Sequence, residues 1–237
     1  MRKNILFIIA TSLLLTSCNE KSKTHAFFID VTASTSISKE SDNTNDLLQS
    51  LRKMIDKKVL GGETIVIYPI HARTGSAASI FNDKMPLPVN LNWKTERENK
   101  LDKIVSDVND KLFIKSIIDQ NIRSNSSIFP IFSKLKKVSK DGIIEVTIIS
   151  DMIEYTSSMN FYEKLNSLNN NAVKQLAIQK YSESKDEFSI MNTNFSILIP
   201  GTEAGNKYSD DFNRKVNTFW ETFFREAGAK VFISDLS

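Results

Sequence analysis

Short apolar runs typical of buried strands alternate along this chain with longer segments in which apolar residues recur at helical spacing. The strand-like runs span residues 26–29, 64–70, 143–149, 195–199 and 230–233. The helix-like segments span residues 46–58, 94–118, 127–138, 161–180 and 208–227. This alternation predicts an α/β fold, in which a mostly parallel sheet is covered by helices on both faces.

Local signals refine this pattern. Pro69 indicates that the strand over 64–70 is an edge strand or ends there, because proline cannot donate to a sheet ladder. A turn at 73–76 leads into a short second strand over 78–81, which predicts an edge hairpin. The helix over 94–118 is long enough to be broken, and Asn169–Asn171 predict a surface loop that interrupts the helix over 161–180.

Two of the predicted strands end at an aspartate, namely Asp30 and Asp151. In open α/β sheets, ligands bind beyond the carboxyl ends of the strands, at the point where the strand order reverses. Asp30, Thr32 and Ser34 place three oxygen-bearing side chains at alternate positions, where they can face one point that suits a hard cation such as Mg²⁺. A zinc or copper site has few ligands available, because the chain has two histidines and one cysteine.

In these residues the chain resembles the von Willebrand factor A (vWA) family. The metal-ion-dependent adhesion site (MIDAS) of that family uses Asp-x-Ser-x-Ser after the first strand, a threonine from a later loop and an aspartate after the fourth strand. Asp30, Thr32 and Ser34 match the first element, and Ser126 stands in the place of the later threonine. Asp151 matches the last element, but Met152 replaces the glycine that usually follows it, so we expect a different local turn.

The resemblance extends from Phe27 to Ile233 and implies a vWA-like (Rossmann-like) domain over residues 26–237, with one antiparallel edge strand. It also implies that Asp30, Thr32, Ser34, Ser126 and Asp151 hold Mg²⁺, or else Mn²⁺ or Ca²⁺, directly or through water. One coordination position would remain open for a carboxylate of a partner protein. The chain is then a binding module with no catalytic residue, rather than an enzyme.

Three other interpretations remain open at this stage. Asp30, Ser34 and Ser126 could cap the helices that follow them, and Asp151 could serve a turn. The domain could also be a metal-free scaffold that acts through surface contacts alone.

The third alternative interpretation is a phosphohydrolase of the haloacid dehalogenase type, which would use Asp30, Ser150 and the pair Asp210-Asp211. That family has a second aspartate two places after its nucleophile, and Thr32 stands there instead. A proton donor for the leaving group is therefore missing, which makes this interpretation the weaker one.

The first residues indicate export. Arg2 and Lys3 precede an apolar run over residues 5–15 that is too short to span a bilayer, as in a secretory signal peptide over residues 1–17. The sequence Leu15-Thr16-Ser17-Cys18 resembles the lipobox of bacterial lipoproteins. That resemblance implies cleavage before Cys18 and lipidation of its thiol, with residues 18–25 forming the anchor and a short tether.

The remaining composition bears on location and partners. Cys18 is the only cysteine, so the mature domain has no disulfide. The formal net charge of +3 includes Arg2 and Lys3, so the mature domain is nearly neutral and nucleic acid is an unexpected partner. We expect a lipid-anchored protein of the cell envelope, and Asn19 after the cysteine favours the outer membrane over the inner one.

Overall fold

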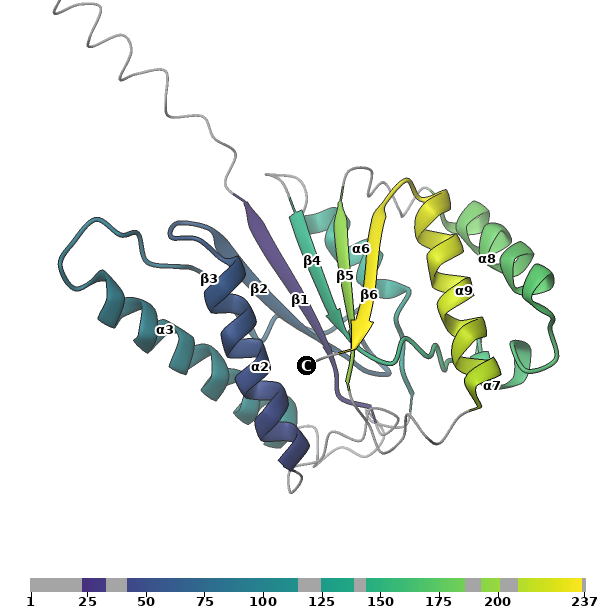
Figure 1. The fold of residues 1–237 in the computed structure, drawn as a ribbon, viewed down its shortest axis with the longest axis horizontal. Helices are drawn as coiled ribbons and strands as arrows, with labels where there is room; N and C mark the ends of the chain where they lie inside the picture. Colours follow the sequence, from purple (N-terminus) through teal and green to yellow (C-terminus); the bar gives the residue numbers. More distant parts are fainter. Residues whose placement is uncertain are drawn as a thin grey trace, which may run out of the picture.

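A computed structural model describes residues 23–32, 42–114, 125–138, 144–185, 193–200 and 209–235. Its centre is a six-stranded sheet with the strand order β3-β2-β1-β4-β5-β6, shown in Figure 1. The strands are β1 (Thr24–Asp30), β2 (Thr64–Ile70), β3 (Phe81–Lys84), β4 (Ile144–Ile149), β5 (Asn194–Ile199) and β6 (Lys230–Asp235). All neighbouring pairs are parallel except β2 and β3, which confirms the predicted vWA-like sheet with one antiparallel edge strand.

The strand order reverses beside β1. From β1 the chain proceeds outward to β2 and β3, and it then returns to place β4 on the other side of β1. Ile29 of β1 lies opposite Ile149 of β4 in the parallel register, so both strands end at the same edge of the sheet. This edge is the switch point at which α/β folds bind their ligands.

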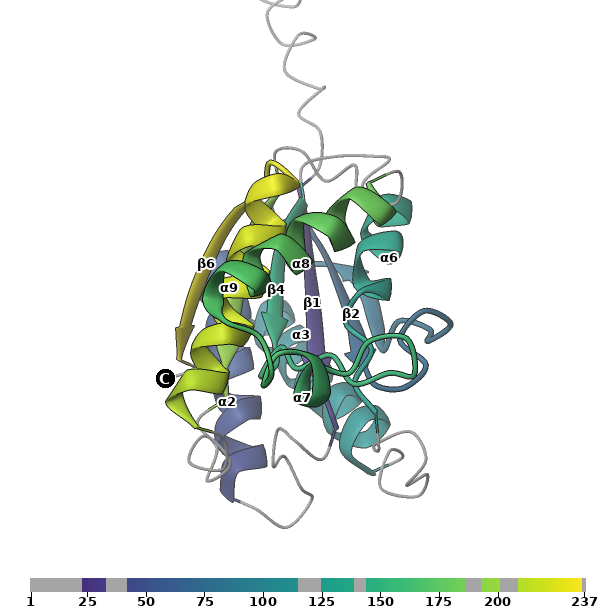
Figure 2. The same cartoon turned by 90° about the vertical axis from the view of Figure 1, so that its right-hand side faces the viewer.

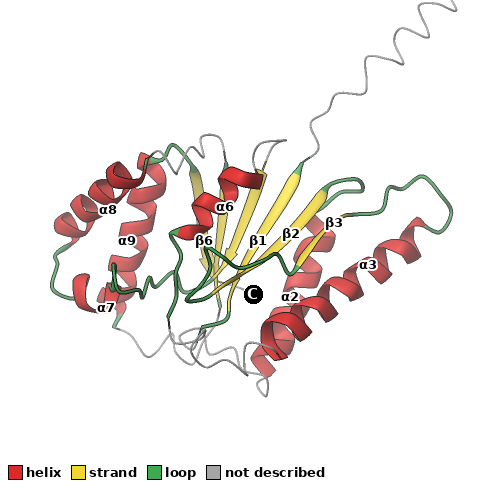
Figure 3. Ribbon diagram, turned by 180° about the vertical axis from the view of Figure 1, so that it is seen from behind, coloured by secondary structure: helices red, strands yellow, loops and turns green. Residues whose placement is uncertain are grey.

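Helices cover both faces of the sheet, as predicted. One face carries α2 (Asp42–Lys58), α3 (Trp93–Val108) and the π-helical segment η2 (Asn109–Ile114). The other carries α6 (Pro130–Val138), α7 (Phe161–Lys164), α8 (Asn170–Ser184) and α9 (Asp210–Glu226), as Figures 2 and 3 show.

Each face has its own hydrophobic core. The core under α6 to α9 is rich in fully buried aromatic side chains, namely Phe132, Phe161, Phe195, Phe219, Trp220, Phe223 and Phe224. The core under α2 and α3 is mainly aliphatic and includes Leu51, Ile55, Ile65, Ile67, Leu101 and Ile104. The four aromatic residues of α9 were predicted to be core from their helical spacing, and the structure confirms this.

Several predicted element boundaries differ from the observed ones, and three differences concern the edge strand and the two interrupted helices. The edge strand β3 spans Phe81–Lys84 rather than 78–81, because its pairing with β2 begins at Phe81 opposite Ile67. The predicted helix over 94–118 is α-helical only to Val108 and then widens into η2. Asn169 does more than interrupt a helix, because its side chain accepts from Ala172 N at 3.0 Å and caps α8.

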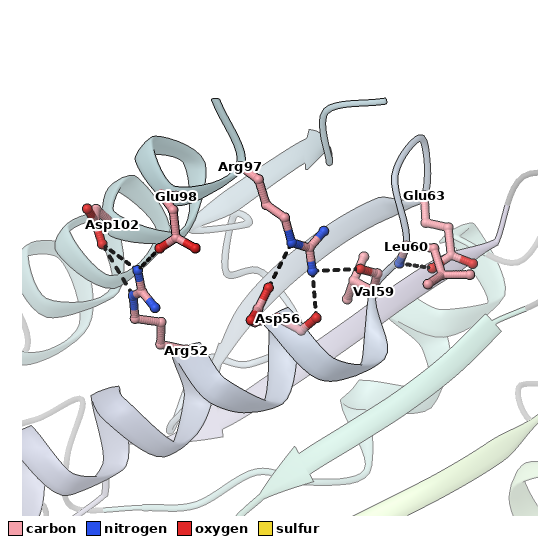
Figure 4. Close-up of polar contacts among 8 residues, drawn as sticks. All are labelled: Arg52, Asp56, Val59, Leu60, Glu63, Arg97, Glu98 and Asp102. Atoms are coloured by element: carbon pink, nitrogen blue, oxygen red, sulfur yellow. Dashed lines mark hydrogen bonds and ion pairs between the residues drawn. The ribbon is translucent and has the colours of Figure 1, made fainter. Parts of the chain in front are cut away.

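Two arginines join α2 to α3 (Figure 4). Arg97 donates from Nε to Asp56 Oδ1 at 2.7 Å and from Nη2 to the carbonyl oxygens of Asp56 and Val59 at 2.6 and 3.1 Å. Arg52 pairs with Glu98 and with Asp102, both of which are exposed. Exposed ion pairs contribute up to about 1 kcal/mol, so the carbonyl contacts of Arg97 fix the helix pair more firmly.

Candidate functional site

The candidate site lies where β1 and β4 end. Asp30 is the last residue of β1, and Ser150 and Asp151 directly follow β4. Ser126 comes from the segment before α6, so three parts of the chain that are distant in sequence meet here. The side chain of Asp30 has no exposed surface, and Thr32, Ser126 and Ser150 are also buried.

Both oxygens of the Asp30 carboxylate accept hydrogen bonds. Oδ1 accepts from Thr32 N at 2.9 Å and from Thr32 Oγ1 at 2.7 Å. Oδ2 accepts from Ser126 Oγ at 3.2 Å and from Ser150 Oγ at 2.7 Å. Burial raises the pKa of Asp30, while these hydrogen bonds act in the opposite direction because they stabilise the charged form.

The structure brings together three of the five predicted metal ligands. Thr32 and Ser126 each donate a hydrogen bond to Asp30. Asp151 directly follows Ser150 and is partly exposed, and its Oδ1 accepts from Ile153 N at 3.1 Å. Ser34 lies outside the described residues, as do Cys18 and the signal peptide.

The helix-capping interpretation fails for Ser126 and stays open for Asp30, because residues 33–41 lie outside the described residues. The carboxylate of Asp30 contacts Thr32, Ser126 and Ser150. Ser126 lies four residues before the start of α6, and its hydroxyl donates to Asp30. Asp151 does serve a turn, because it accepts from the backbone two residues later.

Met152 adopts a backbone conformation that favours glycine. Its φ of 59° lies in the left-handed region, which a residue with a Cβ adopts at a cost of about 1 kcal/mol. Met152 N donates to Ser150 Oγ at 2.9 Å, and Met152 O accepts from Trp220 Nε1 at 2.7 Å. Hydrogen bonds on both sides thus hold the methionine backbone in a conformation that glycine adopts without strain.

Replacing Met152 by glycine tests whether the left-handed backbone strain or the packing of the buried side chain has the larger effect on stability. The substitution removes the left-handed strain but also removes a side chain that is only 2% exposed. Loss of a buried methionine costs about 2–5 kcal/mol, so we expect a net loss of about 1–3 kcal/mol in urea denaturation. A more stable Met152→Gly variant would show that strain at this turn outweighs the packing.

Glu154 is a second buried carboxyl group near Asp30. Its Oε2 accepts from Ile128 N at 2.6 Å and from Phe129 N at 3.3 Å, just before α6. Burial, with a smaller contribution from the charge of Asp30, raises the pKa of Glu154 from 4.5 to about 7. Glu154 thus fixes the segment that presents Ser126, and Tyr155 N reinforces it by donating to Ser126 O at 2.9 Å.

Sequence reasoning missed two members of this cluster. Ser150 was considered only for the phosphohydrolase alternative, and Glu154 was not considered. An acidic residue directly after the apolar pair Met152-Ile153 was the available signal for Glu154, because a carboxyl group among buried residues requires partners.

A polar hollow of about 340 Å³ borders the cluster. Its lining includes Asn125, which precedes Ser126, and Tyr155, which follows Glu154. The other lining residues are Thr156, Ser157, Asn160 and Glu163. The hollow is therefore lined by amide, hydroxyl and phenol groups and by the carboxylate of Glu163.

The donor set around Asp30 consists of oxygen atoms. Within the described ranges, no three His, Cys, Asp or Glu side chains gather into a metal-binding group, so hydroxyl groups supply most of the oxygens near Asp30. In the same part of the chain, no helix is long and apolar enough to cross a membrane.

Comparisons with known proteins give distant likenesses only. No family model matches the chain, and no curated protein matches it. Similar solved structures include an aerotolerance-related membrane protein from Bacteroides fragilis, with 10% identity, a TM-score of 0.43 and coverage of 90% of this chain and 92% of that one. The manganese-loaded TRAP protein of Plasmodium vivax has 9% identity, a TM-score of 0.36 and coverage of 86% and 74%.

A third similar structure is proximal thread matrix protein 1 from the mussel byssus, with 10% identity and a TM-score of 0.42. The match covers 88% of this chain and 49% of that one. Function therefore has to be inferred from the residues of the chain itself.

Proposed function

We propose that this protein is an envelope-anchored binding module that holds a divalent cation and, through it, an acidic group of a partner protein. The observation that carries the proposal is the meeting of Asp30 with the hydroxyls of Thr32 and Ser126 at the carboxyl ends of β1 and β4. A bound divalent cation would supply a positive centre that accepts a partner carboxylate.

The residues present fit a hard cation. Mg²⁺, Mn²⁺ and Ca²⁺ prefer oxygen ligands, and the cluster offers one buried carboxylate with hydroxyls on two sides. Those hydroxyls donate to Asp30 in the structure, so they would have to turn their lone pairs toward an ion. A nearby positive charge would also offset the burial that raises the pKa of Asp30.

The roles of the remaining residues follow from their positions. Asp151 is partly exposed, so a partner carboxylate would reach the ion from its side. Ser34 would complete the set from the segment after β1. Lipid on Cys18 would hold the domain at the membrane, and each buried methylene of an acyl chain contributes about 0.8 kcal/mol to that anchoring.

Paramagnetic relaxation by Mn²⁺ tests the proposal directly. A blocked Gly-Asp-Gly peptide, added to protein and Mn²⁺, should show protein-dependent broadening of its aspartate proton signals. The matched Gly-Asn-Gly peptide should not, because its amide is a poor ligand for the ion. Equal broadening of both peptides, or none beyond that caused by free Mn²⁺, would contradict carboxylate capture.

A metal-free scaffold is the second candidate, and one observation favours it. Both oxygens of Asp30 already accept hydrogen bonds, from Thr32, Ser126 and Ser150, so the cluster can join the ends of β1 and β4 without an ion. In that case Asp30 stabilises the fold, and partners bind elsewhere on the surface.

No observation favours the phosphohydrolase. Asp30 has no exposed surface from which to attack a phosphate, and Thr32 Oγ1 donates to it from the place of the missing acid. Asp210 and Asp211 lie in the first turn of α9, where Asp211 pairs with Lys215 at 2.8 Å.

A further inference from the structure

Exposed apolar side chains gather at one corner of the molecule. In the described part of the chain six large hydrophobic residues are exposed, and four of them are Leu60, Leu87, Val89 and Leu91, at 66%, 53%, 78% and 101%. Leu60 lies in the turn between α2 and β2, and the other three lie in the loop between β3 and α3. We call these four residues the apolar corner.

The backbone of the apolar corner is held in place. Gly62 N donates to Met85 O, and Met85 N donates to Glu63 O, both at 2.9 Å. The loop packs closely on the glycine turn, since a Cβ on Gly61 would lie 2.7 Å from Pro86 O. The start of the loop is therefore held against the glycine turn, while its apolar side chains stay exposed to solvent.

The apolar corner lies at the end of the molecule where β1 begins. Lys23 O accepts from Thr64 N at 3.0 Å, and two strand spacings of about 4.8 Å separate β1 from β3. Figures 1 and 3 show the start of β1 and the loop before α3 at the same end, opposite the carboxyl ends of the parallel strands. Cys18 lies five positions before Lys23, and five extended residues span at most about 18 Å, so a lipid on Cys18 would keep this end close to the bilayer.

Exposed lysines also lie at this end. They lie in the last turns of α2 and α6, at the end of β3 and at the start of α3, and are Lys57, Lys58, Lys84, Lys94, Lys136 and Lys137.

Several acidic groups at this end are already engaged. Glu63 accepts from Leu60 N and contacts His25, and Glu145 pairs with Lys23. Glu96 accepts from the side-chain amide of Asn90 at 3.2 Å. Lys57, Lys84, Lys94 and Lys137 are exposed at this end, where the phosphates of an anionic bilayer would meet them.

We propose that this end of the domain is a second membrane contact, in which the apolar corner enters the headgroup region of an anionic bilayer and the surrounding lysines bind lipid phosphates. The inference rests on the anchoring part of the proposed function and not on the cation. Apolar loops and lysine clusters each bind membranes weakly, and together with a lipid they fix an orientation. The cluster around Asp30 then faces away from the membrane, toward a partner.

Vesicle binding by a chain without the lipid tests this contact. A chain that begins at Asn19 keeps both hydrophobic cores, which lie entirely beyond residue 25. Vesicles of phosphatidylethanolamine and phosphatidylglycerol should bind it. They should also shift the emission of Trp93 to the blue, because Trp93 borders the loop and is partly exposed, whereas Trp220 is buried.

The triple substitution Leu87→Ser, Val89→Ser and Leu91→Ser should lower vesicle binding by about tenfold or more and abolish the Trp93 shift. Phe232→Ser is the matched control, because Phe232 is 66% exposed but lies on β6. It should bind like the wild type. Lys57→Gln with Lys58→Gln should weaken binding to phosphatidylglycerol vesicles at low salt but not to phosphatidylcholine vesicles.

Three outcomes would overturn the inference. The triple variant could bind vesicles as the wild type does, or Phe232→Ser could lose as much binding as the triple variant. The triple variant could instead convert a dimer to a monomer in size-exclusion chromatography without changing vesicle binding, which would make the corner a contact between copies. Asp30→Asn should bind vesicles normally, so failure of cation binding and failure of membrane contact are distinguishable.

Discussion

Millimolar Mg²⁺ or Mn²⁺ should raise the melting temperature of the wild-type protein and should leave that of Asp30→Asn unchanged. An ion that binds only the folded state at a hundredfold excess over its Kd stabilises that state by about 2.7 kcal/mol. For a domain of this size, that corresponds to a rise of about 5–10 °C in differential scanning fluorimetry. Asparagine has nearly the shape of aspartate but lacks its charge, so the ion loses its one buried anionic ligand.

The metal-induced shift is the quantity to compare, since Asp30→Asn changes the stability without metal as well. Ser150→Ala is a suitable control, because it removes the 2.7 Å hydrogen bond to Asp30 but no ligand from the proposed set. It should lower stability by about 1–3 kcal/mol yet keep most of the metal response. Ser126→Ala should weaken the response, because its hydroxyl belongs to the set.

An unresponsive wild type at millimolar metal would contradict the cation site. The same holds if Asp30→Asn were stabilised by metal as much as the wild type. Asp30 would then be a buried structural carboxylate that joins β1 to the segments of Ser126 and Ser150. The metal-free scaffold would become the better description of the protein.

The sequence predicted the fold because the fold depends on patterns that span many residues. Period-two and period-3.6 spacing of apolar residues predicted the strands and helices. The alternation of strands and helices then predicted a parallel sheet. The contact between Asp30 and Ser126 agrees with the place that the resemblance to the vWA family gave to Ser126. Local boundaries were less predictable, because the start of β3 depends on its pairing with β2 and the widening at η2 depends on local backbone hydrogen bonding.

The parts of the site that were missed depend on the direction of single side chains. Ser150 precedes the matched Asp151, and only the turn at Met152 decides which of the two points at Asp30. Glu154 acts on backbone N–H groups of Ile128 and Phe129, which no spacing along the chain could place beside it. Tertiary packing determines such contacts, so they become visible only in the structure.

Glu154→Gln should make the protein markedly more stable than the wild type at pH 8 and nearly equal to it at pH 5. Burial raises the pKa of Glu154 from 4.5 to about 7, so the folded protein binds this proton more tightly than the unfolded chain does. The contribution of Glu154 to stability is therefore largest below pH 4.5 and is lost as the pH rises through about 7. Because one pKa unit corresponds to about 1.4 kcal/mol, the loss reaches about 3 kcal/mol.

Glutamine keeps an oxygen that can accept from Ile128 N and Phe129 N, but it carries no charge at any pH. Urea denaturation of both proteins between pH 5 and pH 8 gives the difference in unfolding free energy, in which the titration of other groups largely cancels. Glu163→Gln makes the same chemical change at an exposed position. The unfolding free energy of this variant should change with pH as that of the wild type does. If the unfolding free energy of Glu154→Gln showed the same pH dependence as that of the wild type, the two backbone donors would be sufficient to hold Glu154 as a buried carboxylate throughout this range. The hydrogen bonds of an ionised Glu154 would then hold the segment that presents Ser126 at every pH in this range.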